Sequence, residues 1–136
     1  SRTPMSTLAD RAARVRERIA DAALRAGRDP AAVTLIAVTK THPVETVREA
    51  LAAGLTDLGE NRVQELVAKA AEVPDARWHL IGSLQRNKAR DAARLVALVH
   101  TVDDEALADA LDRKAAEAGR VLPVLVQVNV SGEAQK

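Results

Sequence analysis

The feature that most constrains the fold is a regular alternation of short apolar runs with helical segments. The apolar runs cover residues 33–39, 55–58, 78–81, 96–102 and 122–130, so that a new run begins roughly every twenty residues. Parallel strands need a crossover of about a dozen residues or more, usually a helix, and these intervals just allow one. The sequence therefore predicts an α/β fold with a parallel sheet, in the order helix, four strand–helix units, and a fifth strand.

Amphipathic segments fill the intervals between the apolar runs. Helices are predicted over about 43–53, 61–73, 86–95 and 104–118, and a further helix precedes the first strand. Ser6 or Thr7 can cap that first helix, and Gly27 can end it. Its predicted buried face consists of Leu8, Ala12, Val15, Ile19, Ala22 and Ala26. We predict one domain over 1–136, in which 1–5 form a disordered tail or a remnant of cloning.

The composition excludes several classes of protein. The chain has no Cys, which rules out a disulfide framework and a cysteine nucleophile and fits a reducing cytoplasm. A net charge of +1 and a single aromatic residue, Trp78, argue against nucleic acid, whose binding needs many phosphate contacts or stacking side chains. No apolar run approaches the roughly 18 residues of a membrane span. Neither a Gly-x-Gly-x-x-Gly loop nor a P-loop occurs.

Candidate functional residues are sought at the carboxyl ends of the strands, where parallel α/β folds gather their sites. Lys40 follows the first strand, and its amine could form a Schiff base with an aldehyde or could simply be a solvated loop residue. Asn61 follows the second strand and could bind a ligand or cap the next helix. His79 lies inside the third strand, and it could contact a ligand or could simply make its hydrogen bonds within the sheet. The three histidines do not have the spacing of metal ligands.

Four segments of the chain resemble one known family. They are IAVTKTHP at 36–43, GENRVQE at 59–65, WHLIGSLQRNK at 78–88 and VQVNVS at 126–131. Together they resemble the pyridoxal phosphate homeostasis proteins, and the resemblance extends from the first helix to the end of the chain. It is specific because four motifs occur in order at suitable separations.

The resemblance implies a fold and a cofactor. The expected fold is a single parallel βα-barrel like the N-terminal domain of alanine racemase, and the expected cofactor is pyridoxal 5′-phosphate, bound as a Schiff base to Lys40. Asn61 and Lys136 correspond to family positions near the cofactor. With His79, they complete the predicted cofactor-binding set, and no catalytic residue is predicted. Family members continue for roughly three more strands, so we expect the chain to hold about five of the eight strands of a barrel and to be truncated at its C-terminus.

The resemblance also implies a function. Members of the family are described as buffers or carriers of pyridoxal phosphate without established turnover, so a cytoplasmic monomer that serves pyridoxal-phosphate-dependent apo-enzymes is expected. Many members carry a second Lys two residues after the first, where this chain has His42. A neutral imidazole there would repel the Lys40 ammonium less and could alter cofactor exchange.

Two other functions stay open at this point. A racemase or decarboxylase would use the same cofactor but needs a second catalytic residue, and no such residue is recognised in the sequence. A half-barrel that binds no cofactor could instead be an interaction module, whose strand edges pair with another chain.

Overall fold

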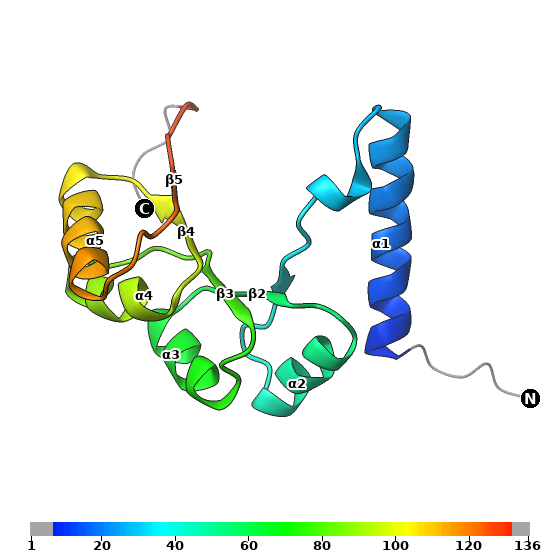
Figure 1. The fold of residues 1–136 in the computed structure, drawn as a ribbon, viewed down its shortest axis with the longest axis horizontal. Helices are drawn as coiled ribbons and strands as arrows, with labels where there is room; N and C mark the ends of the chain where they lie inside the picture. The colour runs from blue at the N-terminus through cyan, green and yellow to red at the C-terminus, as the bar shows by residue number, and fades with distance from the viewer. Residues whose placement is uncertain (1–6, 132–136) are drawn as a thin grey trace, which may run out of the picture.

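A computed structural model of the chain describes residues 7–131. The predicted order of elements is confirmed (Figure 1). The elements are α1 (Leu8–Arg25), η1 (Pro30–Ala32), β1 (Ala37–Val38), α2 (Val44–Ala52), β2 (Asp57–Glu60), α3 (Val63–Glu72), β3 (Arg77–Leu80), η2 (Arg86–Lys88), α4 (Ala89–Leu95), β4 (Leu98–Val102), α5 (Glu105–Glu117) and β5 (Val124–Val126). The predictions for 1–5 and for Lys136 lie outside the described residues.

The five strands form one parallel sheet in the order β1-β2-β3-β4-β5. Helices α2 to α5 cover one face of this curved sheet, and the other face is open (Figure 1). An open doubly wound sheet would reverse its strand order at a switch point and carry helices on both faces. A strictly sequential order with the crossover helices on one side is instead the arrangement of a barrel segment, which confirms the predicted fold class.

The hydrophobic core lies between the sheet and helices α2 to α5. Its fully buried members come from both layers: Val47, Leu58, Leu66, Leu80, Val96, Val99, Leu107 and Leu111. Trp78 is also buried, and its indole Nε1–H donates to the Val73 carbonyl oxygen at 3.1 Å. Full burial of a Leu side chain stabilises a fold by about 1.5–3 kcal/mol, so this layer holds β2, β3 and β4 firmly in place.

The predicted helix starts are confirmed where a side chain caps them. Thr7 Oγ1 accepts from the backbone N–H of Asp10 at 3.1 Å, and the Asp10 carboxylate accepts from the Thr7 N–H at 3.1 Å. These two bonds form a capping box at the start of α1. Asp104 Oδ1 accepts from the Leu107 N–H at 2.7 Å and caps α5.

The two ends of the sheet differ from the prediction. Strand β1 covers only Ala37–Val38 of the predicted strand 33–39, and β5 covers only Val124–Val126 of the predicted strand 122–130. All three residues of β5 are exposed. An edge strand has a neighbour on one side only, so an apolar run alone overestimates how far such a strand extends.

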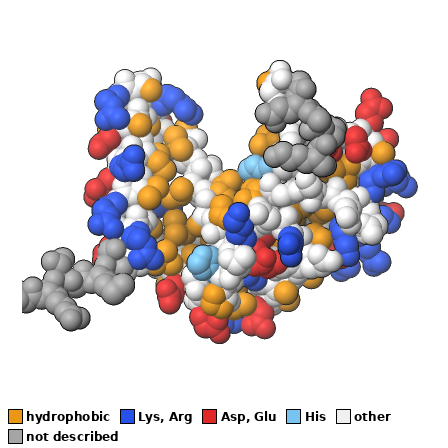
Figure 2. Space-filling model, turned by 180° about the vertical axis from the view of Figure 1, so that it is seen from behind, with side chains coloured by type: hydrophobic (Ala, Val, Ile, Leu, Met, Phe, Trp, Pro, Cys, Tyr) orange, Lys and Arg blue, Asp and Glu red, His pale blue; other side chains and the backbone are white. Residues whose placement is uncertain are grey.

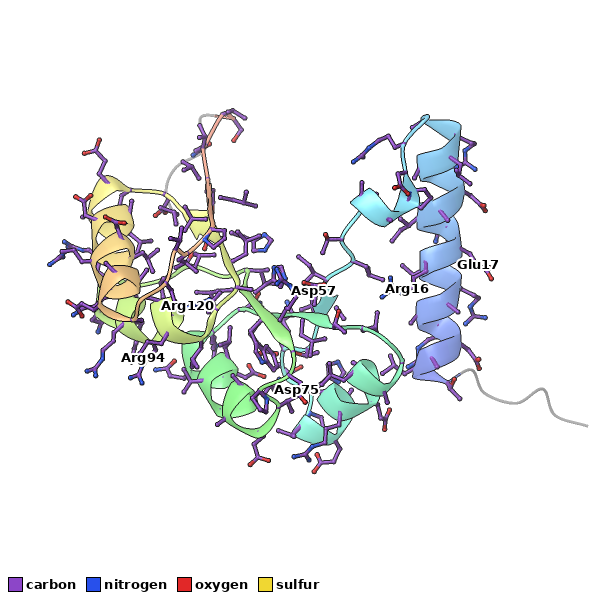
Figure 3. All side chains as sticks on the ribbon, viewed as in Figure 1. Arg16, Glu17, Asp57, Asp75, Arg94 and Arg120 are labelled. Atoms are coloured by element: carbon purple, nitrogen blue, oxygen red, sulfur yellow. The ribbon has the colours of Figure 1, made fainter. Side chains whose placement is uncertain are left out.

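The predicted buried face of α1 is confirmed only in part, since Leu8 and Ile19 are half-buried but Ala22 and Ala26 are exposed. Ala12 is buried, but Val15 is 43% exposed, because α1 packs mainly on η1 and α2 and not on the sheet. Arg16 supports this contact, since its Nη2 donates to the Gly54 carbonyl oxygen at 3.1 Å (Figure 3). The space-filling view shows a hollow beside α1 with hydrophobic side chains along it (Figure 2). Among residues 7–131, no helix has the length and apolar character to cross a bilayer.

Candidate functional site

The carboxyl ends of β1 and β2 bring two predicted site residues to the same edge of the sheet. The parallel register pairs Val38 with Gly59, and the Thr39 N–H continues the pairing by donating to the Gly59 carbonyl oxygen at 3.0 Å. Lys40 comes two residues after Val38, and Asn61 comes two residues after its partner Gly59. The two residues therefore occupy equivalent positions just beyond adjacent strands, at the edge of the sheet where the sequence predicts a site.

Asn61 is held at this edge by its backbone. A Cβ atom on Gly82 would lie 2.1 Å from the Asn61 carbonyl oxygen, so the close approach of the two chains requires glycine at 82. Thr101 Oγ1 then donates to the Gly82 carbonyl oxygen at 2.7 Å, which ties in the end of β4. The alternative role for Asn61, capping the next helix, is wrong: the N-cap of α3 is Arg62, and it makes no side-chain cap.

Lys40 projects from a tight turn between β1 and α2. Its side chain is exposed, whereas Thr39 before it is buried. The His42 N–H donates to the Thr39 carbonyl oxygen at 3.1 Å, which closes the turn. Thr41 has a φ of +64°, a left-handed conformation that costs a β-branched residue of order 1–3 kcal/mol. Such a conformation persists only where the surrounding structure enforces it.

The enforcing contacts come from a group of side chains that we call the Lys69 cluster, made of Thr39, Thr41, Glu60, Glu65 and Lys69. The Lys69 ammonium donates to the Thr39 carbonyl oxygen at 2.6 Å, to Glu60 Oε2 at 3.0 Å and to Glu65 Oε2 at 2.8 Å. Glu65 Oε2 also accepts from the Thr41 N–H at 2.8 Å. Thr39 Oγ1 donates to Glu60 Oε2. The residues on both sides of Lys40 are thus bonded to one cluster.

Burial makes these interactions strong. Glu60 is 0% exposed, the Lys69 side chain is 6% exposed, and Glu65 lies at the rim. Burial by itself would lower the pKa of Lys69, but hydrogen bonds to Glu65 and Glu60 and the charges of both carboxylates raise that pKa above its ordinary 10.5. The hydrogen bond from Lys69 holds the pKa of Glu65 below its ordinary 4.5, against the opposing effect of burial and with help from the Thr41 N–H.

Sequence reasoning missed Glu60, Glu65 and Lys69 as site residues. One signal was available, because Glu65 and Lys69 are four residues apart on α3 and can pair on one helix face. That spacing is common on exposed helices and does not indicate burial. The bonds to Thr39 and Glu60 depend on how α3 packs on the sheet.

His79 lies in a second group, the histidine cluster, made of Asp57, Arg77, His79 and His100. Trp78 and Leu80 on either side of it face the helices, so His79 faces the open side of the sheet. His79 Nε2 lies 2.8 Å from Asp57 Oδ1, and its Nδ1 lies 3.0 Å from His100 Nε2. Arg77 Nε donates to the same Asp57 oxygen at 3.2 Å.

The histidine cluster begins at the amino ends of the strands, where Asp57 of β2 (Figure 3) is paired with Arg77 of β3, whereas Lys40 follows the carboxyl end of β1. The buried His79 ring joins this pair to His100 of β4, which lies two residues beyond the Leu98 that is in register with His79. Burial, and secondarily the neighbouring His79, lower the pKa of His100 below its ordinary 6.5. Within the described ranges, no set of three or more His, Asp or Glu side chains is arranged to hold a metal ion.

The chain is similar to proteins of known name and structure. It is 50% identical over 134 residues to the pyridoxal phosphate homeostasis protein of Pseudomonas aeruginosa, covering 97% of this chain and 58% of that protein. It matches the structure of PipY of Synechococcus elongatus PCC7942 with PLP bound, with a TM-score of 0.73 and 49% identity over 88% of this chain and 57% of PipY.

A further structural relative is a protein from Bifidobacterium adolescentis described as unknown, with a TM-score of 0.82 and 36% identity. It is matched over 94% of this chain and 57% of its own length. The chain thus spans a little over half the length of the relatives it matches. The resemblance to pyridoxal phosphate homeostasis proteins is confirmed by these names. Residues 11–133 match the family model described as alanine racemase, N-terminal domain, and the chain belongs to that family.

Proposed function

We propose that this protein binds pyridoxal 5′-phosphate as a Schiff base on Lys40 and serves as a carrier or buffer of that cofactor. The observation that carries the proposal is the placement of Lys40. Its amine is exposed at the carboxyl edge of a barrel-type sheet, while the backbone on both sides of it is bonded to a buried ionic cluster. A related protein of the same fold, PipY, has been solved with PLP bound, which supports the choice of ligand.

The residues at this edge fit an aldehyde ligand. A primary amine is the group that condenses with an aldehyde: the Lys40 nitrogen forms a C=N bond to the aldehyde carbon, and one water molecule leaves. When bound, pyridoxal phosphate supplies an aldehyde and an electron-withdrawing ring. We propose that Asn61, at the end of the adjacent strand, donates a hydrogen bond to that ring. Lys136 and His79 stay predictions as cofactor contacts, and the structure gives His79 other partners.

The carrier role sets further expectations. We propose that the protein has no amino-acid turnover of its own, works as a monomer in the cytoplasm, and passes the cofactor to pyridoxal-phosphate-dependent apo-enzymes. The names of its relatives indicate homeostasis and support this reading over a racemase or decarboxylase. His42 lies in the same exposed turn as Lys40, and we expect it to influence how fast the cofactor exchanges.

The test is an absorbance titration of the purified protein with pyridoxal phosphate. We expect a visible band characteristic of a protonated Schiff base, which saturates at one equivalent and is absent in Lys40→Ala and Lys40→Arg. Lys114→Ala removes an equally charged exposed lysine and serves as the control, with the band unchanged. A band that survives in Lys40→Ala would contradict the proposal.

A further inference from the structure

The Lys69 cluster has a geometry that a purely structural ion pair would not need. Its ammonium has three hydrogens, and all three are donated within the cluster, one of them to the carbonyl oxygen of the residue just before Lys40. Its rim carboxylate, Glu65, accepts from the amide of the residue just after Lys40. Lys40 itself has no part in these bonds and stays exposed.

We propose that Lys69 and Glu65 are positioning residues for Lys40: they clamp the 39–41 backbone in its left-handed turn and thereby aim the Lys40 amine. This inference rests on the proposed function of Lys40 and adds to it the residues that orient the amine. The clamp explains why Thr41 keeps a φ of +64° without being glycine. Its strength comes from charged hydrogen bonds in a buried setting, which are stronger than neutral ones.

The clamp acts on cofactor binding through preorganisation. A free turn would let the Lys40 amine sample many orientations, and binding would then have to restrict them. With the turn fixed by α3, that restriction is already present in the free protein. The raised pKa of Lys69 and the lowered pKa of Glu65 keep both groups ionised over the whole neutral range, so the clamp does not open near pH 7.

The chain offers a matched pair of glutamates for the test. Glu65 and Glu72 both lie on α3, and both accept from a cation at 2.8–3.1 Å, but the partner of Glu72 is the exposed Arg48 of α2. Glu65→Ala removes the acceptor for the Thr41 N–H, Glu65→Gln keeps an acceptor oxygen without its charge, and Glu72→Ala is the control. Glu65 is partly exposed, so its variants are expected to fold. Lys69→Met is left out of this test because it would leave the buried Glu60 without its ion-pair partner.

Two measurements are made on each variant of the purified protein. The first is hydrogen exchange of the Thr41 amide without ligand, which reports the clamp alone. The second is the affinity for pyridoxal phosphate, with borohydride labelling of Lys40. We expect Glu65→Ala to lose protection at Thr41, because its hydrogen bonds from Thr41 and Lys69 are both removed, and to bind pyridoxal phosphate about tenfold more weakly. Glu65→Gln should recover part of both effects, and Glu72→Ala should resemble the unchanged protein.

Each other outcome overturns a defined claim. If Thr41 exchange rises in Glu65→Ala but affinity stays within twofold of the unchanged protein, the turn is not a positioning device. Unchanged Thr41 exchange in Glu65→Ala would show that no clamp exists, and an equal loss in Glu72→Ala would reduce the effect to general helix stability. Absence of label on Lys40 in the unchanged protein would instead overturn the proposed function, and this inference with it.

Discussion

Strand β2 carries two polar clusters on its opposite faces. Glu60, at its carboxyl end, is buried against the helices and belongs to the Lys69 cluster, whereas Asp57, at its amino end, faces the open side and holds the histidine cluster. In the first cluster the pKa of Glu65 is lowered and that of Lys69 is raised, so both groups stay charged near neutral pH. In the second, burial lowers the pKa of His100 below its ordinary 6.5. One strand thus carries, on its two faces, an ion pair that supports the Lys40 turn and a cluster that contains a titratable histidine.

The largest expected effect is on the buried ion pair. Lys69→Met leaves Glu60 as an unpaired buried charge and should lower the free energy of unfolding by about 3–5 kcal/mol. Urea denaturation measures this loss. Lys114→Met is the control, because the Lys114–Glu117 pair is exposed and should contribute less than about 1 kcal/mol. Equal losses in the two variants would mean that the Lys69 cluster is no stronger than a surface pair.

A smaller loss is expected in the histidine cluster. Asp57→Ala removes the partner of buried His79 Nε2, which should cost about 1–3 kcal/mol in urea denaturation. Asp75→Ala is the control, since Asp75 is exposed in the turn before β3 and its removal should change stability by no more than about 0.5 kcal/mol (Figure 3). A loss in Asp57→Ala no greater than that of Asp75→Ala would show that His79 is stable without its partner.

The two clusters should respond differently to pH. The pKa of His100 is lowered in the folded protein, so the unfolded chain binds more protons below pH 6.5. The contribution of neutral His100 to the free energy of unfolding is therefore fully present above pH 6.5 and is lost as the pH falls through its lower pKa in the folded protein. The pKa of Glu65 is below 4.5 and that of Lys69 is above 10.5, so both groups keep their charge and their contribution to stability at the pH values where His100 titrates. The contribution of Glu65 is lost only as the pH falls through its own pKa, and that of Lys69 only as the pH rises through its own.

Urea denaturation at several pH values tests this difference. The unchanged protein should lose stability as the pH falls below 6.5, and His100→Gln should show a flatter dependence over the same range. Glu65→Gln should keep the dependence of the unchanged protein there. A slope that survives in His100→Gln would place the titrating group elsewhere.

The smallest effect concerns the turn above the Lys69 cluster. Thr41→Asn should stabilise the protein by about 0.5–1 kcal/mol, because Asn tolerates the left-handed conformation better than a β-branched residue. Thermal unfolding measures the gain. Thr46→Asn in α2 provides the comparison, since a helical site offers no such relief and should show no gain. A destabilised Thr41→Asn would mean that the threonine side chain itself is needed in the turn.

The sequence predicted much of the fold because its signals are local. The strand–helix order, the cap at Thr7, and the shared edge of Lys40 and Asn61 all follow from spacing and residue type. The extent of β1 and β5 and the exposure of Val15 could not be predicted in this way. They depend on which neighbours each element has, and an apolar pattern shows only that a residue can be buried.

The candidate site was predictable in its exposed part and not in its buried part. Lys40 is recognised by its place after a strand and by the motif around it. Its support comes from Glu60 at the end of β2 and from Glu65 and Lys69 on α3, and these meet only because α3 packs on the sheet. The orientation of His79 toward Asp57 likewise depends on strand register.

The most direct test of the central claim is to identify the lysine that binds the cofactor. The protein is incubated with one equivalent of pyridoxal phosphate, reduced with borohydride and digested, and the labelled peptides are found by mass spectrometry. We expect one dominant label, on Lys40, with little on Lys114. Comparable labelling of Lys40 and Lys114, or a dominant label on any other lysine, would contradict it.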